Sequence, residues 1–519
     1  MKKLAFGTSL ALASLLALAC TTTPTEVNME ENINTPLVPN TSEAWKPRGQ
    51  HNPVMTQRYG ADPWVMVHDD TVWLYMTGDV IEKDSGGTIK ENTYGTIHTI
   101  NVLSSKDLVN WTDWGSVNVR SASSWARNSW APAATFRETD EGTEFFLYFA
   151  NNASSIGVLR AKHPAGPFTD PIGKPLVTRE TPNCRDITWL FDPAVLKDDD
   201  GSQYLYFGGG VPEGKTANPK TSRAVKLGAD CISLDGDPVL IDAPYIFEDS
   251  GINKLNGKYW YSYCTNWQVP ESAKTSLGMS SGQIAIMSSN SPLGPFTYEK
   301  VIFKNPGVFF GDWGNNHHAL FEFKGSWYLA YHARLLENRQ RILKGYRSTH
   351  IDKVPLGEDG IWADIRGTPT GVDAVGTLDP YQWQSAATMS SQSGLQTVGA
   401  TAESRRHWSG PRAISGIDRG DWLFLEDVAF GEAGANTLEL RTRQAEGIEA
   451  HEASGFELRL GGPDGELVAT YRFDEQSAAD SGQEWYESSL DLQAPLTGTH
   501  DIFIIFTGRG FEMASWRFK

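Results

Sequence analysis

Residues 191–207 read Phe191-Asp192-Pro193-Ala194-Val195-Leu196-Lys197-Asp198-Asp199-Asp200-Gly201-Ser202-Gln203-Tyr204-Leu205-Tyr206-Phe207. The stretch begins with Asp-Pro, continues with an apolar run, turns at Asp200-Gly201 and ends in an aromatic-rich run. An Asp-Gly pair between two apolar runs is a strong hairpin signal, because Gly adopts positive φ without steric cost. The stretch therefore predicts two antiparallel strands joined by a tight turn.

The same aromatic-rich run recurs five times along the chain, at residues 72–75, 145–149, 203–207, 258–262 and 326–330. The positions that open these repeats are Asp62, Ala131, Asp192, Glu248 and His317, separated by 69, 61, 56 and 69 residues. This period suits four strands and their loops. We expect a five-bladed β-propeller over residues 46–370, with the innermost strands lining a central channel.

The composition agrees with an all-β protein of two domains. The 519 residues include 18 Trp, 17 Tyr, 23 Phe and 50 Gly, which favour pleated strands and tight turns. The net charge of -18 argues against a nucleic-acid partner, which would need clustered Lys and Arg. It fits a neutral substrate, although the acidity more simply keeps a secreted protein soluble. The four cysteines provide no disulfide framework and no zinc-ligand spacing.

The N-terminus indicates export from a bacterial cell. Lys2 and Lys3 precede an apolar run that is too short to span a membrane, which is typical of a signal peptide. The run ends in Leu16-Ala17-Leu18-Ala19-Cys20 and resembles a lipobox, although the usual Leu three residues before the Cys is Ala17. We expect a signal peptide at residues 1–20, a lipid on Cys20 and a flexible tether at residues 21–45, with simple secretion as the alternative. The lipid would be the only link to a membrane.

A second domain follows the repeats. Residues 367–380 have the composition of a linker, and residues 378–519 alternate apolar and polar residues as strands do, without the propeller repeat. We expect a β-sandwich of the jelly-roll type there.

Three repeats open with a carboxylate, namely Asp62, Asp192 and Glu248. An Asp before Pro commonly starts a turn, but two Asp-Pro copies in register before apolar runs favour buried carboxylates that are hydrogen-bonded or functional. The apolar residues before Glu248 would desolvate it and raise its pKa, as a general acid needs at neutral pH, unless an arginine pairs with it. Together these residues supply the acid and base that hydrolysis of a glycosidic bond requires.

Asn315-Asn316-His317-His318 opens the fifth repeat. Neighbouring residues on a strand point to opposite faces, so one histidine is expected to enter the channel. That histidine is either a hydrogen-bonded structural residue or a metal ligand.

With Trp130-Ala131-Pro132 and Phe247-Glu248-Asp249-Ser250-Gly251, these motifs resemble glycoside hydrolase family 43 over roughly residues 50–370, and within it the arabinoxylan arabinofuranohydrolases. The resemblance implies an inverting hydrolase with Asp62 as general base, Glu248 as general acid and Asp192 tuning the pKa of Glu248. It also implies that Trp130, Phe191 and His317 contact substrate. A calcium ion near His317 would be structural, and no cofactor would be required.

The function that the resemblance implies is an α-L-arabinofuranosidase acting on arabinoxylan or a similar plant polysaccharide. A β-xylosidase or another exo-glycosidase with the same carboxylates is an alternative, and a non-catalytic glycan-binding lipoprotein is an alternative of another class. An inverting enzyme needs room for water, so we expect the carboxyls of Asp62 and Glu248 to lie about 6.5 to 9.5 Å apart.

Residues 378–519 resemble a family 6 carbohydrate-binding module, through Ile417-Asp418-Arg419-Gly420-Asp421-Trp422 and His500-Asp501-Ile502-Phe503. Its usual sugar-binding positions are changed, with Gly416 in place of Tyr and Glu512 in place of Asn. We therefore expect a sandwich that packs against the propeller, with a new surface around Trp408, Trp485 and Tyr486 as the alternative.

Overall fold

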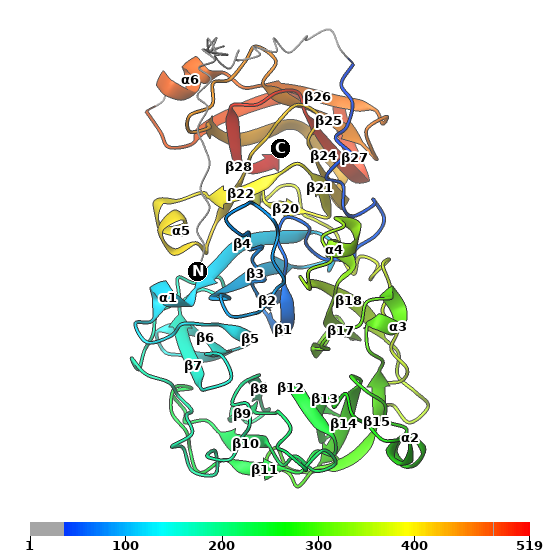
Figure 1. Cartoon of the computed structure of the whole chain (residues 1–519). Coiled ribbons are helices and arrows are strands. Elements are labelled where there is room, and N and C mark those ends of the chain that lie inside the picture. The colour runs from blue at the N-terminus through cyan, green and yellow to red at the C-terminus, as the bar shows by residue number, and fades with distance from the viewer. Residues whose placement is uncertain (1–35, 481) are drawn as a thin grey trace, which may run out of the picture. The chain divides into compact units, whose positions relative to one another are not determined.

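The computed structural model describes residues 36–480 and 482–519. The expected signal peptide, Cys20 and residues 21–35 of the tether lie outside the described residues. Residues 37–519 form one unit, in which five small antiparallel sheets are followed by a larger curled sheet (Figure 1). The expected all-β class, a five-bladed propeller followed by a β-sandwich, is confirmed. Within this part of the chain, no helix is both long enough and apolar enough to cross a bilayer.

Each blade is a meander of three or four strands. Blade 1 comprises β1 (Ala61–His68), β2 (Thr71–Thr77), β3 (Thr99–Ser105) and β4 (Trp111–Asn118); blade 2 comprises β5 (Trp130–Thr139), β6 (Gly142–Ala150) and β7 (Ile156–Ala161); blade 3 comprises β8 (Ala194–Lys197), β9 (Gln203–Phe207), β10 (Ser222–Lys226) and β11 (Val239–Ile241); blade 4 comprises β12 (Ile246–Leu255), β13 (Lys258–Thr265), β14 (Ile284–Ser289) and β15 (Thr297–Phe303); blade 5 comprises β16 (His318–Phe323), β17 (Ser326–Ala333) and β18 (Ser348–Val354). Four short helices lie in the loops: α1 (Val119–Ala122), α2 (Glu271–Leu277), α3 (Gly307–Phe310) and α4 (Leu335–Arg339).

The first strands of the blades contact one another in a closed ring, in the order β1, β5, β8, β12, β16 and back to β1. The five aromatic-rich runs are the second strands β2, β6, β9, β13 and β17. Tyr75, Tyr148, Tyr206, Tyr261 and Tyr328 on these strands are almost completely buried. Their large rings fill the space between adjacent blades, which explains why the sequence repeats them.

Two of the hairpin turns that join first and second strands have the backbone that a tight hairpin needs. Asn256 and Gly257 have φ of 53° and 73°, and Lys324 and Gly325 have φ of 48° and 73°. Positive φ at both central residues is the type I′ geometry, whose twist matches that of the flanking strands. The register of blades 4 and 5 is thus set locally.

The residues that open the first three repeats share an unusual backbone. Asp62, Ala131 and Asp192 have φ of 45°, 41° and 49°. At Asp62 and Ala131 the pairing with the second strand also shifts register, as in a β-bulge. A non-glycine residue pays a steric cost for positive φ, and bulges near sites redirect side chains. The same local distortion therefore recurs at the channel end of successive blades.

The C-terminal domain is a curled sheet of nine strands. They are β19 (Gln384–Ser385), β21 (Ser391–Ser393), β22 (Gln396–Gly399), β23 (Arg412–Ser415), β24 (Trp422–Gln444), β25 (Gly455–Leu460), β26 (Leu467–Arg472), β27 (Tyr486–Phe506) and β28 (Phe511–Phe518), with α5 (Ala402–His407) and α6 (Glu475–Asp480) in the connections. The long strands β24 and β27 pair along their length with four register shifts, which let one hairpin bend through both layers. An apolar core separate from that of the blades fills the domain.

The sandwich packs against blade 1, as expected. Strand β20 (Thr388–Met389) pairs with β4 and extends the blade 1 sheet to five strands. The Ser116 amide donates a 2.9 Å hydrogen bond to the Trp408 carbonyl. Of the cysteines in the described part of the chain, Cys184, Cys231 and Cys264 are all free and buried.

Candidate active site

The fold brings the three predicted carboxylates into one buried cluster. Asp62 is the second residue of β1, Asp192 lies two residues before β8, and Glu248 lies on β12, so three blades each contribute one side chain. Asp62, Asp192 and Glu248 are 5%, 4% and 8% exposed. Carboxylates so deeply buried need partners or carry altered pKa values.

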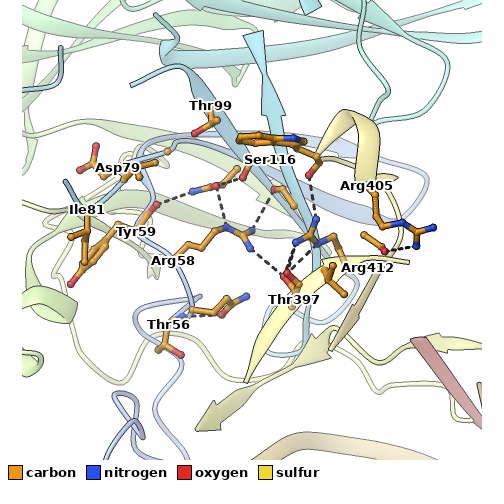
Figure 2. A pocket seen from close by; sticks show the side chains of 18 of the residues that line it. Thr56, Arg58, Tyr59, Asp79, Ile81, Thr99, Ser116, Thr397, Arg405 and Arg412 are labelled. Carbon is orange, nitrogen blue, oxygen red and sulfur yellow. Dashed lines mark hydrogen bonds between the residues drawn. The ribbon is translucent and has the colours of Figure 1, made fainter. Parts of the chain in front are cut away.

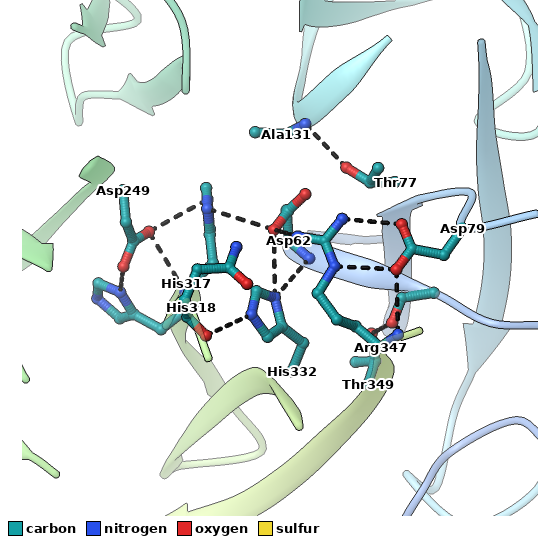
Figure 3. A network of polar contacts seen from close by, with 12 residues as sticks. Asp62, Thr77, Asp79, Ala131, Asp249, His317, His318, His332, Arg347 and Thr349 are labelled. Atoms are coloured by element: carbon teal, nitrogen blue, oxygen red, sulfur yellow. Dashed lines mark hydrogen bonds and ion pairs between the residues drawn. The ribbon is translucent and has the colours of Figure 1, made fainter. Parts of the chain in front are cut away.

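Asp62 is held as an anion by a cationic and hydrogen-bonding network (Figure 3). Arg347 NH1 lies 2.8 Å from Asp62 Oδ1, and His332 Nδ1 lies 3.2 Å from the same oxygen. Burial opposes ionisation, but Arg347, His332 and His317 outweigh it and hold the pKa of Asp62 well below its usual range. Asp62 is thus ionised at any ordinary pH.

Arg347 is itself fixed by a second carboxylate. Its Nε and NH2 groups donate to the two oxygens of Asp79 at 2.9 and 2.8 Å, and its main-chain amide donates to Asp79 at 3.0 Å. Both side chains are almost fully buried. A planar guanidinium gripped in this way holds its remaining NH1 in one direction, toward Asp62.

Asp192 has a different environment. Its Oδ2 accepts a 2.9 Å hydrogen bond from the Asp249 amide, and His317 Nδ1 lies 3.8 Å away. Burial raises the pKa of Asp192 to about 7, against the attraction of His317 and with the repulsion of Asp62. Asp192 therefore titrates near neutrality, which distinguishes it from Asp62 in the same cluster.

Glu248 is shifted toward its protonated form. Burial, followed by the nearby Asp192, Asp62 and Asp249, raises its pKa well above the ordinary value. Among the described residues, Glu248 Oε1 has no hydrogen-bond partner, and no arginine forms an ion pair with this side chain. The alternative of a structural Glu–Arg pair is therefore wrong, and Glu248 is protonated at neutral pH.

The two neighbouring histidines separate as expected. His317 Nδ1 lies 3.6 Å from Asp62 Oδ1, whereas His318 Nε2 turns away to Ser262 Oγ at 2.8 Å. Both rings also reach Asp249, at 3.1 Å from His317 Nε2 and 2.5 Å from His318 Nδ1. Asp249 thus connects the channel histidine to the packing between blades 4 and 5.

The described residues form no metal-binding cluster around His317, so the structural calcium that the family resemblance implies stays a prediction. Both ring nitrogens of His317 are directed at carboxylates. Within residues 36–480 and 482–519, no group of three or more His, Cys, Asp or Glu side chains has an arrangement that could hold a metal ion. We assign no role to a metal here.

The aromatic residues predicted to contact substrate lie beside the cluster. Trp130 is half-buried, and its Nε1 donates to the Tyr94 carbonyl at 3.0 Å. Phe191 is 7% exposed and meets the Trp189 ring edge to face at 5.4 Å. Trp189 also packs on Phe247, next to Glu248, at 5.0 Å. Trp189, Phe191 and Phe247 thus form one aromatic group next to Asp192 and Glu248, whereas Trp130 contacts the Tyr94 backbone.

Asp79, His332 and Arg347 were not found from the sequence, and Asp249 was given no role there. These residues lie after β2, on β17 and just before β18, and they carry no repeated motif. Of these residues, only Asp249 could have been singled out from the sequence, because it adjoins Glu248.

One of the changed sugar-binding positions of the C-terminal module, Glu512, lies in an ion pair. Glu512 pairs with Arg443 at 2.6 Å, and the Arg443 guanidinium lies 4.3 Å from the centre of the Trp485 ring. Trp485 Nε1 donates to the Ala400 carbonyl at 2.8 Å. The substitution at position 512 thus places an ion pair where the family pattern has Asn.

Residues 50–362 match the family described as glycosyl hydrolases family 43, and residues 385–519 match carbohydrate binding module (family 6). The chain is 41% identical over 491 residues to an arabinoxylan arabinofuranohydrolase of Paenibacillus polymyxa, covering 91% of this chain and 74% of that protein. It is also 41% identical to an arabinoxylan arabinofuranohydrolase of Bacillus subtilis, covering 91% of this chain and 92% of that protein. A crystal structure of a Bacillus subtilis family 43 arabinoxylan arabinofuranohydrolase with cellotetraose superposes with a TM-score of 0.85 at 39% identity, covering 92% of this chain and 100% of that one.

Proposed function

The chain belongs to glycosyl hydrolase family 43, and from this premise we propose that it removes α-L-arabinofuranosyl side chains from an arabinoxylan-type polysaccharide with inversion of configuration. The observation that carries the proposal is the opposite perturbation of two carboxylates in one buried cluster. Asp62 is held ionised and Glu248 is held protonated. Environments that push the pKa values of two acids apart assign one as base and the other as acid.

In the proposed reaction a water molecule attacks the anomeric carbon from the face opposite the leaving oxygen. Asp62 accepts a proton from this water, and Glu248 donates its proton to the glycosidic oxygen as the bond to the anomeric carbon breaks. The products are free arabinose and the polysaccharide hydroxyl. Proton exchange with solvent then restores ionised Asp62 and protonated Glu248.

Asp192 acts on Glu248 through charge. It lies close enough to raise the pKa of Glu248, and its bond to the Asp249 amide anchors the backbone immediately after Glu248. We therefore assign Asp192 the role of tuning and orienting the acid.

The choice of arabinose rests on the two relatives at 41% identity over nearly the whole chain. A β-xylosidase would use the same acid and base, so the products separate the two activities. Incubation with arabinoxylan should release arabinose whose anomeric configuration, followed by proton NMR at early times, is inverted. Release of xylose alone from arabinoxylan and xylo-oligosaccharides would refute the proposed specificity.

The assignment of the acid and base is tested with Glu248→Gln and Asp62→Asn. Each should lower kcat by about 10²- to 10⁴-fold, the usual effect of a positioned acid or base. Glu271→Gln is the matched control, because Glu271 lies on α2 with its side chain 84% exposed. Unchanged hydrolysis by either channel variant would refute the mechanism.

We also propose that the protein is exported and lipid-anchored through Cys20. The support is the Lys-Lys start, the apolar run and the lipobox-like end at Cys20. Mass spectrometry of the mature N-terminus should show a diacylglyceryl group on Cys20. An unmodified N-terminus after cleavage would indicate simple secretion instead.

A further inference from the structure

A cavity of about 670 Å³ lies between blade 1 and the C-terminal sandwich (Figure 2). The propeller contributes residues 56–59 and 78–81 to its wall, and the sandwich contributes residues 397–399 with Arg405, Trp408 and Arg412. This volume is in the range of small-molecule sites. Asp62, Asp192 and Glu248 do not line it, although Asp79, which holds Arg347 against Asp62, does, so the cavity adjoins the catalytic cluster.

The charge of this cavity contrasts with that of the whole chain. Its described lining includes three arginines, Arg58, Arg405 and Arg412, and one carboxylate, Asp79. Asp79 is already bound to Arg347. A positively charged cavity in a chain of net charge -18 favours an anionic ligand.

The ion pairs leave one of these arginines without a carboxylate. Arg58 makes two bonds to Asp113, at 2.6 and 2.7 Å, and Arg405 is 2.6 Å from Glu484. Arg412 bonds only to oxygens of Thr397 and Trp408, and within the described part of the chain no carboxylate lies within ion-pair distance of it.

Two guanidinium groups meet at one threonine. Arg58 NH1 and Arg412 NH2 lie 3.4 and 3.3 Å from Thr397 Oγ1, as Figure 2 shows. The single carboxylate beside them, Asp113, is bound by Arg58. One positive charge therefore remains in excess at this wall, which a monovalent anion would balance.

The cavity also has a surface suited to a sugar ring. Trp408 lines it with 50% of the residue exposed, and its backbone carbonyl is fixed by the Ser116 amide. Asn101 and Gln57 add amide groups to the lining. An exposed indole stacks on the apolar face of a sugar, and amides bond its hydroxyls.

We propose that this cavity binds a uronic acid residue, whose ring packs on Trp408 and whose carboxylate pairs with Arg412. The polysaccharide acted on in the channel would carry this acidic sugar, so the inference of substrate class rests on the proposed function. The channel then removes a neutral side chain while the cavity recognises an acidic one.

Calorimetry on the Glu248→Gln protein tests the proposal without turnover. The probes are a xylo-oligosaccharide with one glucuronic acid branch and the same oligosaccharide without it. The acidic probe should bind at least about tenfold more tightly, and Arg412→Gln should remove this preference, because a hydrogen bond between charged groups is worth about ten- to hundredfold in affinity. Arg441→Gln, a sandwich arginine that pairs with Glu487 and does not line the cavity, should leave the preference intact.

Trp408→Ala provides a second variant, because it leaves the Arg412 contacts and the backbone bond to Ser116 in place. It should weaken binding of the acidic probe severalfold. Equal affinity for the two probes, a preference that survives both Arg412→Gln and Trp408→Ala, or displacement of the probe by inorganic phosphate more readily than by free glucuronate would overturn the proposal. Arabinose release from neutral arabinoxylan is measured separately, so failure of the hydrolytic function is distinguishable from failure of this site.

Discussion

Replacing Asp192 by Asn should stabilise the protein at neutral and alkaline pH while it impairs catalysis. The pKa of Asp192 is about 7 in the folded protein, against 3.8 for an ordinary Asp. The folded state therefore keeps a proton that the unfolded state releases. Wild-type stability contributed by this group is present at low pH and is lost as pH rises from about 4 to 7, because the unfolded state then binds fewer protons.

The size of the effect follows from the difference in pKa. A difference of about three between the pKa of Asp192 in the folded and in the unfolded protein corresponds to ~4 kcal/mol. This figure is an upper limit, since solvent relaxation reduces it. Asn cannot ionise, so the variant avoids this cost. It also keeps an oxygen to accept the Asp249 amide, whose bond to Asp192 measures 2.9 Å.

Chemical denaturation of wild type and Asp192→Asn at about pH 4.5 and pH 8 measures the effect through the free energy of unfolding. The variant should gain at least about 1 kcal/mol relative to wild type between the two pH values. Asp198→Asn is a control of opposite sign: burial opposes ionisation of Asp198, but bonds from Lys254 and Tyr259 prevail and lower its pKa. The decrease in the free energy of unfolding caused by Asp198→Asn should be largest at pH 8. A stability difference for Asp192→Asn that does not grow with pH would refute the reasoning.

Three further predictions concern the catalytic groups. Arg347→Met removes the guanidinium 2.8 Å from Asp62, so the pKa of Asp62 should rise and the acidic limb of kcat/KM should move to higher pH; an unchanged limb would contradict this. For a nitrophenyl arabinofuranoside, whose leaving group needs no proton, Glu248→Gln should retain much of its activity and lose the alkaline limb, whereas an alkaline limb that persists would assign the acid elsewhere. In Gly209→Ala the new Cβ would lie 2.7 Å from a backbone oxygen of β12 and 3.3 Å from Glu248 Cα, so kcat should fall about tenfold or more. Gly95→Ala is the control: its new Cβ meets no atom closer than 3.8 Å, and its kcat should match that of wild type.

Much of the propeller was predictable because its signals are local. An aromatic-rich run and a turn such as Asn256-Gly257 specify a hairpin within a dozen residues, and five copies at a similar period require a closed ring. The same repeats located Asp62, Asp192 and Glu248, since each opens its blade at the channel. The burial of Glu248 followed from the apolar residues that precede it.

Arg347, His332 and Asp79 were not predictable in this way. Arg347 reaches Asp62 across 285 positions of the chain, and His332 reaches it across 270. Neither residue belongs to a repeat, so nothing in its neighbourhood distinguishes it from an ordinary polar residue. The cavity next to the sandwich likewise joins Arg58 with Thr397 and Arg412, which come from separate domains.

The sequence by itself determined the all-β class, the number of blades and the identity of the three carboxylates, because these depend on patterns repeated at short range. The sequence also indicated a raised pKa for Glu248, but only the tertiary structure showed which groups hold Asp62 ionised and that no described cation pairs with Glu248. The charge state of a buried acid depends on the sum of its burial and its through-space neighbours, and closure of the ring brings those neighbours from distant blades. Arg347 lies beside Asp62 and no cation pairs with Glu248 in the described chain, so the fold makes a base of the first and an acid of the second.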